Sequence, residues 1–324
     1  MKKLLKKLLI FVCPIIVLAY PADWFISKGL RKSYENVGNF EICNDLYSGD
    51  INTDILVLGS SRALYHVDPD ILEQETNMSA YVLAFDGSRF NIQYELLQEY
   101  LRYNDKPKTI VLSLDNLSIR SPSEVDKKSF LPFMLFNSEM QQSIGKWLNY
   151  SKCDYYIPML RYIGDFSALK FSIRHYLIPQ KERYRRKGYV PVYYHWYTLS
   201  HGKVPYDKSV NDKRDIWEDD YENHLLYKDL FTQFIEECKA AGIELVLVYS
   251  PEYKDRDHVV ATVVQANQYY EKVSREYDVP FFNYADDPMA SDTAYFYNVL
   301  HLNVEGSRKF SRELGIELQQ LKLN

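Results

Sequence analysis

Two adjacent serines and a distant histidine are the residues of this chain whose types and positions suit covalent catalysis. Ser60 and Ser61 follow Gly59, directly after the apolar run 55–58. A serine exposed at such a turn can act as a nucleophile, and free backbone N–H groups of the next segment can stabilise an oxyanion. Serines also serve ordinary turns, so this motif alone is weak. The residue that favours chemistry is His301, near the other end of the chain.

Strands and helices must position these candidates, and the chain alternates between the two on both sides of a long irregular segment. Apolar runs with β-branched members, typical of strands buried on both faces, lie at 54–58, 79–85, 109–114, 243–249 and 279–283. Segments with helical periodicity lie between and after them at 69–75, 91–103, 227–241, 259–277 and 306–321. The pattern predicts an α/β fold with a doubly wound, flavodoxin-like, five-stranded parallel sheet.

The carboxyl ends of the strands are the expected location of a site, since ligands bind there in sheets of this kind. Ser61 follows the first strand at this edge. The loop that carries Asn298 and His301 lies between the fifth strand and the last helix, so it can reach the same edge. His301 can then take a proton from the Ser61 hydroxyl, and Asn298, three positions earlier, can orient the imidazole ring.

These motifs resemble those of the SGNH, or GDSL-like, hydrolases. The Gly-Asp-Ser block of that family corresponds to residues 59–61, and its final Asp-x-x-His block corresponds to residues 298–301. The resemblance covers roughly 51–117 and 225–324. It implies that Ser61 is the nucleophile, His301 the base and Asn298 the orienting residue. The motifs look most like those of membrane-anchored, exported relatives in alginate acetylation and teichoic-acid D-alanylation systems.

The resemblance also implies an oxyanion hole, with two departures from the family pattern. Gly87 matches the glycine of the second block, and Asn116 matches the asparagine of the third block but stands one position late. Asp115 occupies the family position of that asparagine and would repel an oxyanion unless it positions another group. Asn298 replaces the usual aspartate, and an asparagine can orient an imidazole but cannot stabilise imidazolium by charge.

The N-terminal segment has the features of an export signal. Four lysines lie within the first seven residues, and 8–20 is then apolar apart from Pro14 and the Tyr20 hydroxyl. We expect an uncleaved, single-pass signal-anchor over 1–26, a stalk over 27–50 and an SGNH-like α/β domain over 51–324 on the extracytoplasmic side of the cell membrane. A cleaved signal peptide and a buried helix in a cytosolic protein are the alternatives.

A segment rich in Tyr, Arg, Lys and Pro interrupts the alternation at 118–217. It is too long for a loop, so it predicts a large, mostly helical insertion that covers the carboxyl edge of the sheet. Helices are expected at 140–148 and 168–177. The basic run 181–187 favours either a solvated helix face or a contact with anionic glycan or lipid headgroups.

Composition narrows the classes of partner. The net charge of −5 and the mild pI argue against nucleic acid. The 29 tyrosines suit aromatic packing or a carbohydrate partner. The sequence contains no CxxC motif and no Cys/His cluster, so it gives no indication of a zinc site. Cys43 and Cys153 could form a disulfide.

Two functions of different classes follow from these observations. The first is an envelope-anchored serine esterase or O-acyltransferase that acts on acyl groups of a cell-surface glycan or lipid-linked sugar, without metal or cofactor. A membrane-bound O-acyltransferase is then a candidate partner. The second is a catalytically weak protein of the same fold that binds glycan or docks such an acyltransferase, which the Asn298 departure favours.

Overall fold

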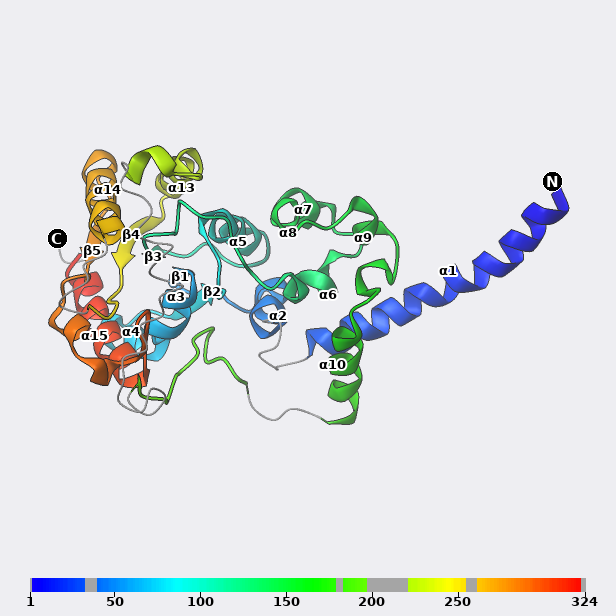
Figure 1. Ribbon diagram of the computed structural model, residues 1–324, viewed down its shortest axis with the longest axis horizontal. Helices are drawn as coiled ribbons and strands as arrows, with labels where there is room; N and C mark the ends of the chain where they lie inside the picture. The colour runs from blue at the N-terminus through cyan, green and yellow to red at the C-terminus, as the bar shows by residue number, and fades with distance from the viewer. Residues whose placement is uncertain (1, 33–39, 179–182, 197–220, 255–260, 322–324) are drawn as a thin grey trace. The chain divides into compact units, whose positions relative to one another are not determined.

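The computed structural model describes residues 2–32, 40–178, 183–196, 221–254 and 261–321, which belong to two compact units (Figure 1). Unit 1 comprises 1–50, 98–103 and 126–184. Unit 2 comprises 51–97, 104–125 and 185–324, and it contains the sheet and all the candidate site residues. The predicted insertion is therefore divided between the units, and its residues 197–217 lie outside the described part of the chain.

A five-stranded parallel sheet forms the centre of unit 2 and confirms the predicted fold class. Its spatial order is β2-β1-β3-β4-β5, the flavodoxin-like order of a doubly wound sheet. The first three strands are buried along their whole length, which explains their unbroken apolar sequences. The strands are β1 (Ile55–Gly59), β2 (Ala80–Ala84), β3 (Thr109–Leu114), β4 (Glu244–Tyr249) and β5 (Phe281–Asn283).

One face of the sheet is covered by three helices, α3 (Ser61–His66), α4 (Pro69–Thr76) and α15 (Val304–Leu321). Apolar side chains of these helices pack with Val57, Val82 and neighbouring strand residues in a single buried cluster. The last helix of the chain thus packs beside the first two helices of unit 2, and residues separated by more than two hundred positions meet at this face.

Helices α5 (Phe90–Tyr103), α13 (Lys228–Ala240) and α14 (Ala261–Tyr277) are the other long helices beside the strands. Phe90 of α5 makes edge-to-face contact with Phe231 of α13, and Phe231 in turn contacts Tyr270 of α14. These aromatic pairs connect the three helices through their buried sides. The start of the helix predicted at 259–277 falls partly outside the described residues.

Unit 1 is helical. The two helices predicted within this part of the chain are present, although the first is divided in two at Ser143. Its helices are α1 (Lys2–Arg31), α2 (Phe40–Ser48), α6 (Leu131–Met134), α7 (Ser138–Gln142), α8 (Gly145–Leu148), α9 (Lys152–Tyr156) and α10 (Phe166–Leu177).

The described parts of the segment expected to be a stalk, 27–32 and 40–50, belong to unit 1. Phe40, Ile42 and Leu46 of α2 are buried, because they lie on an apolar side of the helix that faces the interior. The mixed, polar composition of the segment had concealed this apolar side. The disulfide considered above is absent from the structure, in which Cys43 is buried and Cys153 is exposed.

The C-terminal part of α1 also belongs to the interior of unit 1. Asp23 is buried and pairs with both terminal nitrogens of Arg161, at 2.7 and 2.8 Å. Ile26 and Leu30, one and two turns further on, are buried as well. A search of the described residues for helices that could cross a membrane found none of sufficient length and apolarity.

The basic run predicted as a helix face or an anion contact has another role in its described part. Residues 183–187 form no helix, and an antiparallel bridge joins Arg186 to Tyr189. Arg186 pairs with Asp68, and Lys187 donates to Glu73 of α4 at 2.5 Å. The Lys187 carbonyl accepts a hydrogen bond from the backbone of the edge strand β2. Arg186 and Lys187 thus contact other residues of unit 2 through their charges. Lys181 and Glu182 lie outside the described residues.

Candidate functional site

The turn between β1 and α3 places Ser61 at the first position of a helix. Ser60 is the N-cap in extended conformation, and its hydroxyl accepts from the Arg62 N–H, as a capping serine does. Gly59 is required by space, since a Cβ there would come within 2.7 Å of the Ala63 side chain and 2.9 Å of the Ser113 side chain. The strand and the helix can therefore meet closely enough to present Ser61 half-exposed at the carboxyl edge of the sheet.

A short antiparallel hairpin carries the other two candidates. Its strands are β6 (Phe296–Asn298) and β7 (His301–Leu302), and Asn298 pairs directly with His301. The Asn298 side-chain oxygen accepts the backbone N–H groups of Leu300 and His301, each at 2.9 Å. This side-chain bond to the backbone closes the two-residue loop and explains why the two residues are three positions apart.

The structure brings Ser61, His301 and Asn298 together in one line of contacts. The His301 Nε2 atom lies 2.8 Å from the Ser61 Oγ atom. The His301 Nδ1 atom lies 3.1 Å from the Asn298 Oδ1 atom. A nucleophile within hydrogen-bond distance of a base, with a third group on the far nitrogen of that base, is the arrangement required for an activated serine.

The hydrogen bonds of Asn298 also determine which nitrogen of His301 carries the proton. Because Oδ1 accepts two backbone N–H groups, turning the amide over would place its NH2 group against two donors. The oxygen therefore faces Nδ1, and Nδ1 carries the hydrogen that it accepts. The lone pair of Nε2 then faces the Ser61 hydroxyl, which is the tautomer that general-base catalysis needs.

His301 is held neutral by its surroundings. Burial is the main cause, and with the positive charge of Arg62 it lowers the pKa of His301 to about 3, although the Asp115 carboxylate opposes the shift. The imidazole is thus available as a proton acceptor well into the acid range. It is also a weak base, because no negative charge on Asn298 favours the imidazolium form.

Tyrosine rings surround His301 and were not anticipated from the sequence. The Tyr297 ring stacks on the imidazole at an interplanar angle of 11°, and its hydroxyl lies 3.3 Å from Nδ1. The Tyr65 ring of α3 meets the imidazole edge-on. Tyr297 lies four positions before His301, a spacing that could have indicated it. Asp292, an acidic residue in the loop before the hairpin, caps a short turn by accepting the Ala294 N–H.

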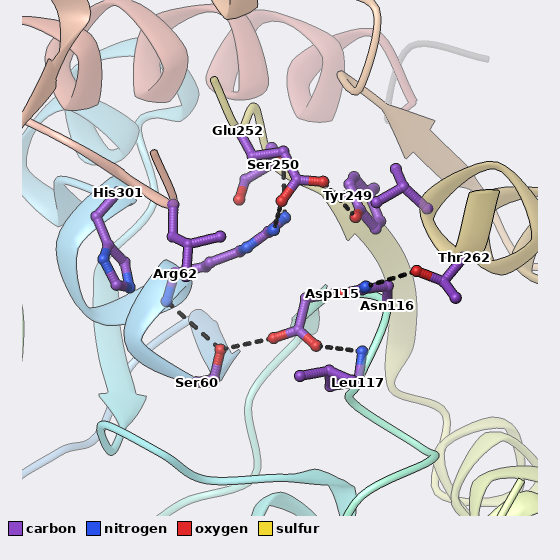
Figure 2. A network of polar contacts seen from close by, with 12 residues as sticks. Ser60, Arg62, Asp115, Asn116, Leu117, Tyr249, Ser250, Glu252, Thr262 and His301 are labelled. Carbon is purple, nitrogen blue, oxygen red and sulfur yellow. Dashed lines mark hydrogen bonds and ion pairs between the residues drawn. The ribbon is translucent and has the colours of Figure 1, made fainter. Parts of the chain in front are cut away.

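Asp115, which would repel an oxyanion if its charge were isolated, is compensated by its neighbours (Figure 2). One carboxylate oxygen accepts from the Ser60 hydroxyl at 3.2 Å and pairs with Arg89 at 3.4 Å. The other accepts the Leu117 N–H at 2.8 Å. Burial alone would raise the pKa of Asp115, but the charges of Arg89 and Arg62 hold it below its ordinary value. The residue thus positions the serine turn.

The two predicted oxyanion residues lie in different surroundings. Asn116 is buried, and its amide donates to Thr262 of α14 at 3.2 Å, the direction that Figure 2 shows. Gly87 occupies a turn with a φ of +70°, and a Cβ there would come within 2.8 Å of the Glu124 carbonyl, so glycine is required. The next residue, Ser88, donates to the Gly59 carbonyl at 2.8 Å and attaches this turn to the serine turn.

Arg62 is enclosed within the site. Its guanidinium pairs with Glu252, donates to the Ser250 carbonyl at 3.4 Å and lies 5.1 Å from the centre of the Tyr249 ring. Glu252 follows the turn after β4 that the sequence suggested as part of the active edge. Arg62 is therefore buried and paired, which indicates a structural role next to Ser61.

His66 lies at the end of α3 and holds the loop that carries His301. Its Nε2 atom accepts the Leu302 N–H at 3.1 Å, so Nδ1 is the protonated nitrogen and donates to the Ser250 hydroxyl at 2.8 Å. Burial, with a contribution from the positive charge of Arg62, lowers the pKa of His66 well below its ordinary value.

Replacing His66 by leucine is expected to reduce the free energy of unfolding by about 2–5 kcal/mol at pH 7.5, because the buried Leu302 N–H loses its acceptor and the buried Ser250 hydroxyl loses its donor. The folded-state pKa is lowered, so the unfolded chain takes up the proton first as the pH falls below the ordinary value of 6.5. The native protein therefore loses this part of its stability in acid, and the difference between the two proteins should narrow at pH 5. Urea titrations followed by circular dichroism at both pH values measure it; an unchanged difference would contradict the assignment.

Asn303 fixes the junction of the hairpin with the last helix. Its side-chain oxygen accepts the N–H groups of Glu305 and Gly306, both at 3.0 Å, and its amide nitrogen donates to the Ala294 carbonyl at 2.7 Å. A Cβ at Gly306 would lie 2.2 Å from the Tyr295 carbonyl oxygen. The Asn and Gly that follow His301 in the sequence motif thus bring α15 against the loop.

Comparisons with known proteins add little at the level of sequence. No protein-family model matches the chain, and no curated protein matches it. Among solved structures, the chain is similar to a protein from Desulfitobacterium hafniense DCB-2 described as belonging to the G-D-S-L lipolytic family. That similarity has 9% sequence identity and a TM-score of 0.41, and it covers 82% of this chain and 98% of the other.

Proposed function

We propose that this protein is a serine esterase or O-acyltransferase in which Ser61, His301 and Asn298 act together. The observation that carries the proposal is the pair of contacts made by one imidazole, with Ser61 Oγ at 2.8 Å from one nitrogen and Asn298 Oδ1 at 3.1 Å from the other. Ser61 comes from the turn between β1 and α3, whereas Asn298 and His301 come from one hairpin near the other end of unit 2.

The reaction proceeds through an acyl-enzyme. The His301 Nε2 atom takes the Ser61 proton as Oγ attacks the ester carbonyl, and the imidazolium then gives that proton to the departing alcohol oxygen. Water or a sugar hydroxyl next attacks the acyl-serine, with His301 again receiving and returning a proton. We assign Gly87 and the backbone N–H groups around Ser61 to the oxyanion. Asn116, whose amide is engaged with Thr262, is the less favoured donor.

Acyl groups of a cell-surface glycan or lipid-linked sugar are the proposed substrate, and the proposed location is the outer side of the cell membrane. The support for both is the resemblance of the sequence motifs to exported SGNH proteins, together with the basic and apolar N-terminal sequence. A membrane-bound O-acyltransferase is the proposed partner on the same basis.

A second candidate function is a binding or docking protein with little turnover. The observation that favours it is the neutral Asn298, which leaves His301 with a low pKa and no charge to stabilise its protonated form. In that case the glycan would bind at the same edge of the sheet, and Ser61 would not be acylated.

Labelling of the full-length protein with a fluorophosphonate probe separates the two functions. The probe forms a covalent bond only with an activated serine, so we expect labelling that disappears in Ser61→Ala. Ser60→Ala is the matched control: it loses a helix cap and the bond to Asp115 but should still be labelled. Labelling of neither the native protein nor Ser60→Ala, together with no hydrolysis of acetyl esters at any pH, would favour the binding protein.

A further inference from the structure

Helix α10 of unit 1 exposes a stripe of large apolar side chains. Its members recur at intervals of three and four residues, the spacing of one helix face. The most exposed are Phe166, at 83%, and Leu177, at 75%. We define the α10 stripe as Phe166, Leu169, Ile173 and Leu177, all of which are exposed.

The opposite side of α10 packs on α1, so the stripe is not the face that holds the helix in place. Ser172 is buried, and its hydroxyl donates to the Phe25 carbonyl at 3.4 Å. A Cβ at Gly29 would clash with Ser172, which shows how closely the two helices approach. The stripe is turned away from this contact by roughly a third of a turn.

The apolar surface continues from α10 onto α1. The ring of Tyr176 stacks on Phe25 at 4.4 Å between centroids, and both rings are exposed. Trp24, the next residue, is exposed as well, with the Lys28 ammonium 4.6 Å above its ring. A tryptophan beside a lysine suits the boundary between lipid and water, where an apolar ring and a charged end are both satisfied.

The exposed charged side chains of α10 itself, and those of α1 beside it, are positive. Lys170 and Arg174 border the α10 stripe on the helix surface and are exposed, and α10 contains no acidic residue. The single acidic residue of α1, Asp23, is buried against Arg161 and therefore does not reach the surface. A second copy of the chain would bring like charges together, whereas an anionic surface would meet complementary ones.

We infer that the α10 stripe is a docking surface for an anionic lipid bilayer. The helix has twelve residues, too few to cross the hydrocarbon layer, so it lies along the membrane with its apolar side chains in the headgroup boundary. Lys170 and Arg174 then contact lipid phosphates. This contact is additional to any anchoring by the N-terminal segment, and it does not depend on the proposed catalytic function.

Depth-sensitive fluorescence on the full-length protein tests the inference. In a Cys13→Ser, Cys153→Ser background, which removes the two exposed thiols, single cysteines at Phe166→Cys and Leu177→Cys carry an environment-sensitive dye. The matched control is Ile316→Cys on α15, an exposed apolar position in unit 2. With vesicles containing phosphatidylglycerol, we expect a blue shift and increased emission at 166 and 177, loss of emission with doxyl-labelled lipids, and no change at 316.

Charge-neutralised variants make the result decisive. Lys170→Gln with Arg174→Gln should lose most of the spectral change at 166, and so should vesicles made of phosphatidylcholine alone. Equal changes in neutral vesicles would overturn the anionic preference. Spectra at 166 and 177 that match those at 316 would overturn the docking surface. A spectral change that appears only when native membrane proteins are present would also overturn it, because that result would assign the stripe to a protein partner.

Discussion

The His301→Ala variant is expected to hydrolyse activated acetyl esters about three to four orders of magnitude more slowly than the native protein. Removing the histidine of a complete serine triad costs about a millionfold, and losing its carboxylate alone costs about ten-thousandfold. The native site already has Asn298 in place of the carboxylate, so less remains to be lost. The ratio of these two figures, about a hundredfold, is the smallest loss to expect. The Asn298 contacts preserve the correct tautomer of His301, however, so we expect His301 to contribute more than that.

Chemical rescue distinguishes a lost base from a damaged fold. Added imidazole can enter the space left by the His301 side chain and should restore part of the rate in His301→Ala, but not in the double variant with Ser61→Ala. His224→Gln, a histidine of unit 2 on a short helical turn, is the control and should retain the native rate. A His301→Ala protein that keeps more than a tenth of the activity would show that another group takes the serine proton.

The Asn298→Asp variant is expected to be about ten- to a hundredfold faster than the native protein at neutral pH. A carboxylate 3.1 Å from Nδ1 favours the imidazolium form and should raise the pKa of His301 by about one to three units. A base whose pKa is nearer the working pH removes the serine proton more readily. The aspartate also fits its surroundings, since the same two backbone N–H groups donate to it. The gain is smaller than the ten-thousandfold loss seen for the opposite change in serine proteases, which includes a wrong tautomer.

The pH dependence of kcat/KM provides the second measurement for this variant. The base must be neutral to act, so activity is lost as the pH falls through its pKa. In the native protein that pKa is about 3, and the rate should stay level from pH 7 to pH 5. In Asn298→Asp the acid limb should move upward. A rate and pH profile identical to those of the native protein would show that Asn298 does not contact the working histidine. Asn298→Ala is the control, since it removes the side-chain hydrogen bonds that close the hairpin.

The sheet and the serine turn were predictable because their signals are local. An apolar run followed by Gly59 and two serines specifies a buried strand and a tight turn within a few residues, and the hairpin from Asn298 to His301 closes through its own side chain. The alternation of strands and helices predicted a doubly wound parallel sheet of five strands, which the structure contains. These parts of the fold require no knowledge of which distant segments meet.

The compensation of charge around the site was not predictable, since it depends on tertiary contacts. Asp115 was expected to disturb an oxyanion, and only the structure shows it bonded to Ser60 and Arg89. The pairing of Arg62 with Glu252 joins residues almost two hundred positions apart. The composition of unit 1 was missed for a similar reason, because three separate segments contribute to it, and the sequence assigned them to an N-terminal anchor and stalk, to one helix and to the insertion.

The hydrogen bonds around Asn298 have a consequence for handling the protein. An asparagine can deamidate to aspartate with time, and here the product would occupy the same place and accept the same two backbone hydrogens. Direct hydrolysis of the side-chain amide, which consumes water and releases ammonia, would thereby create the more active form without moving the backbone. Even a small deamidated fraction could dominate a measured rate, so the mass of the peptide containing residue 298 should be determined on every sample whose activity is compared.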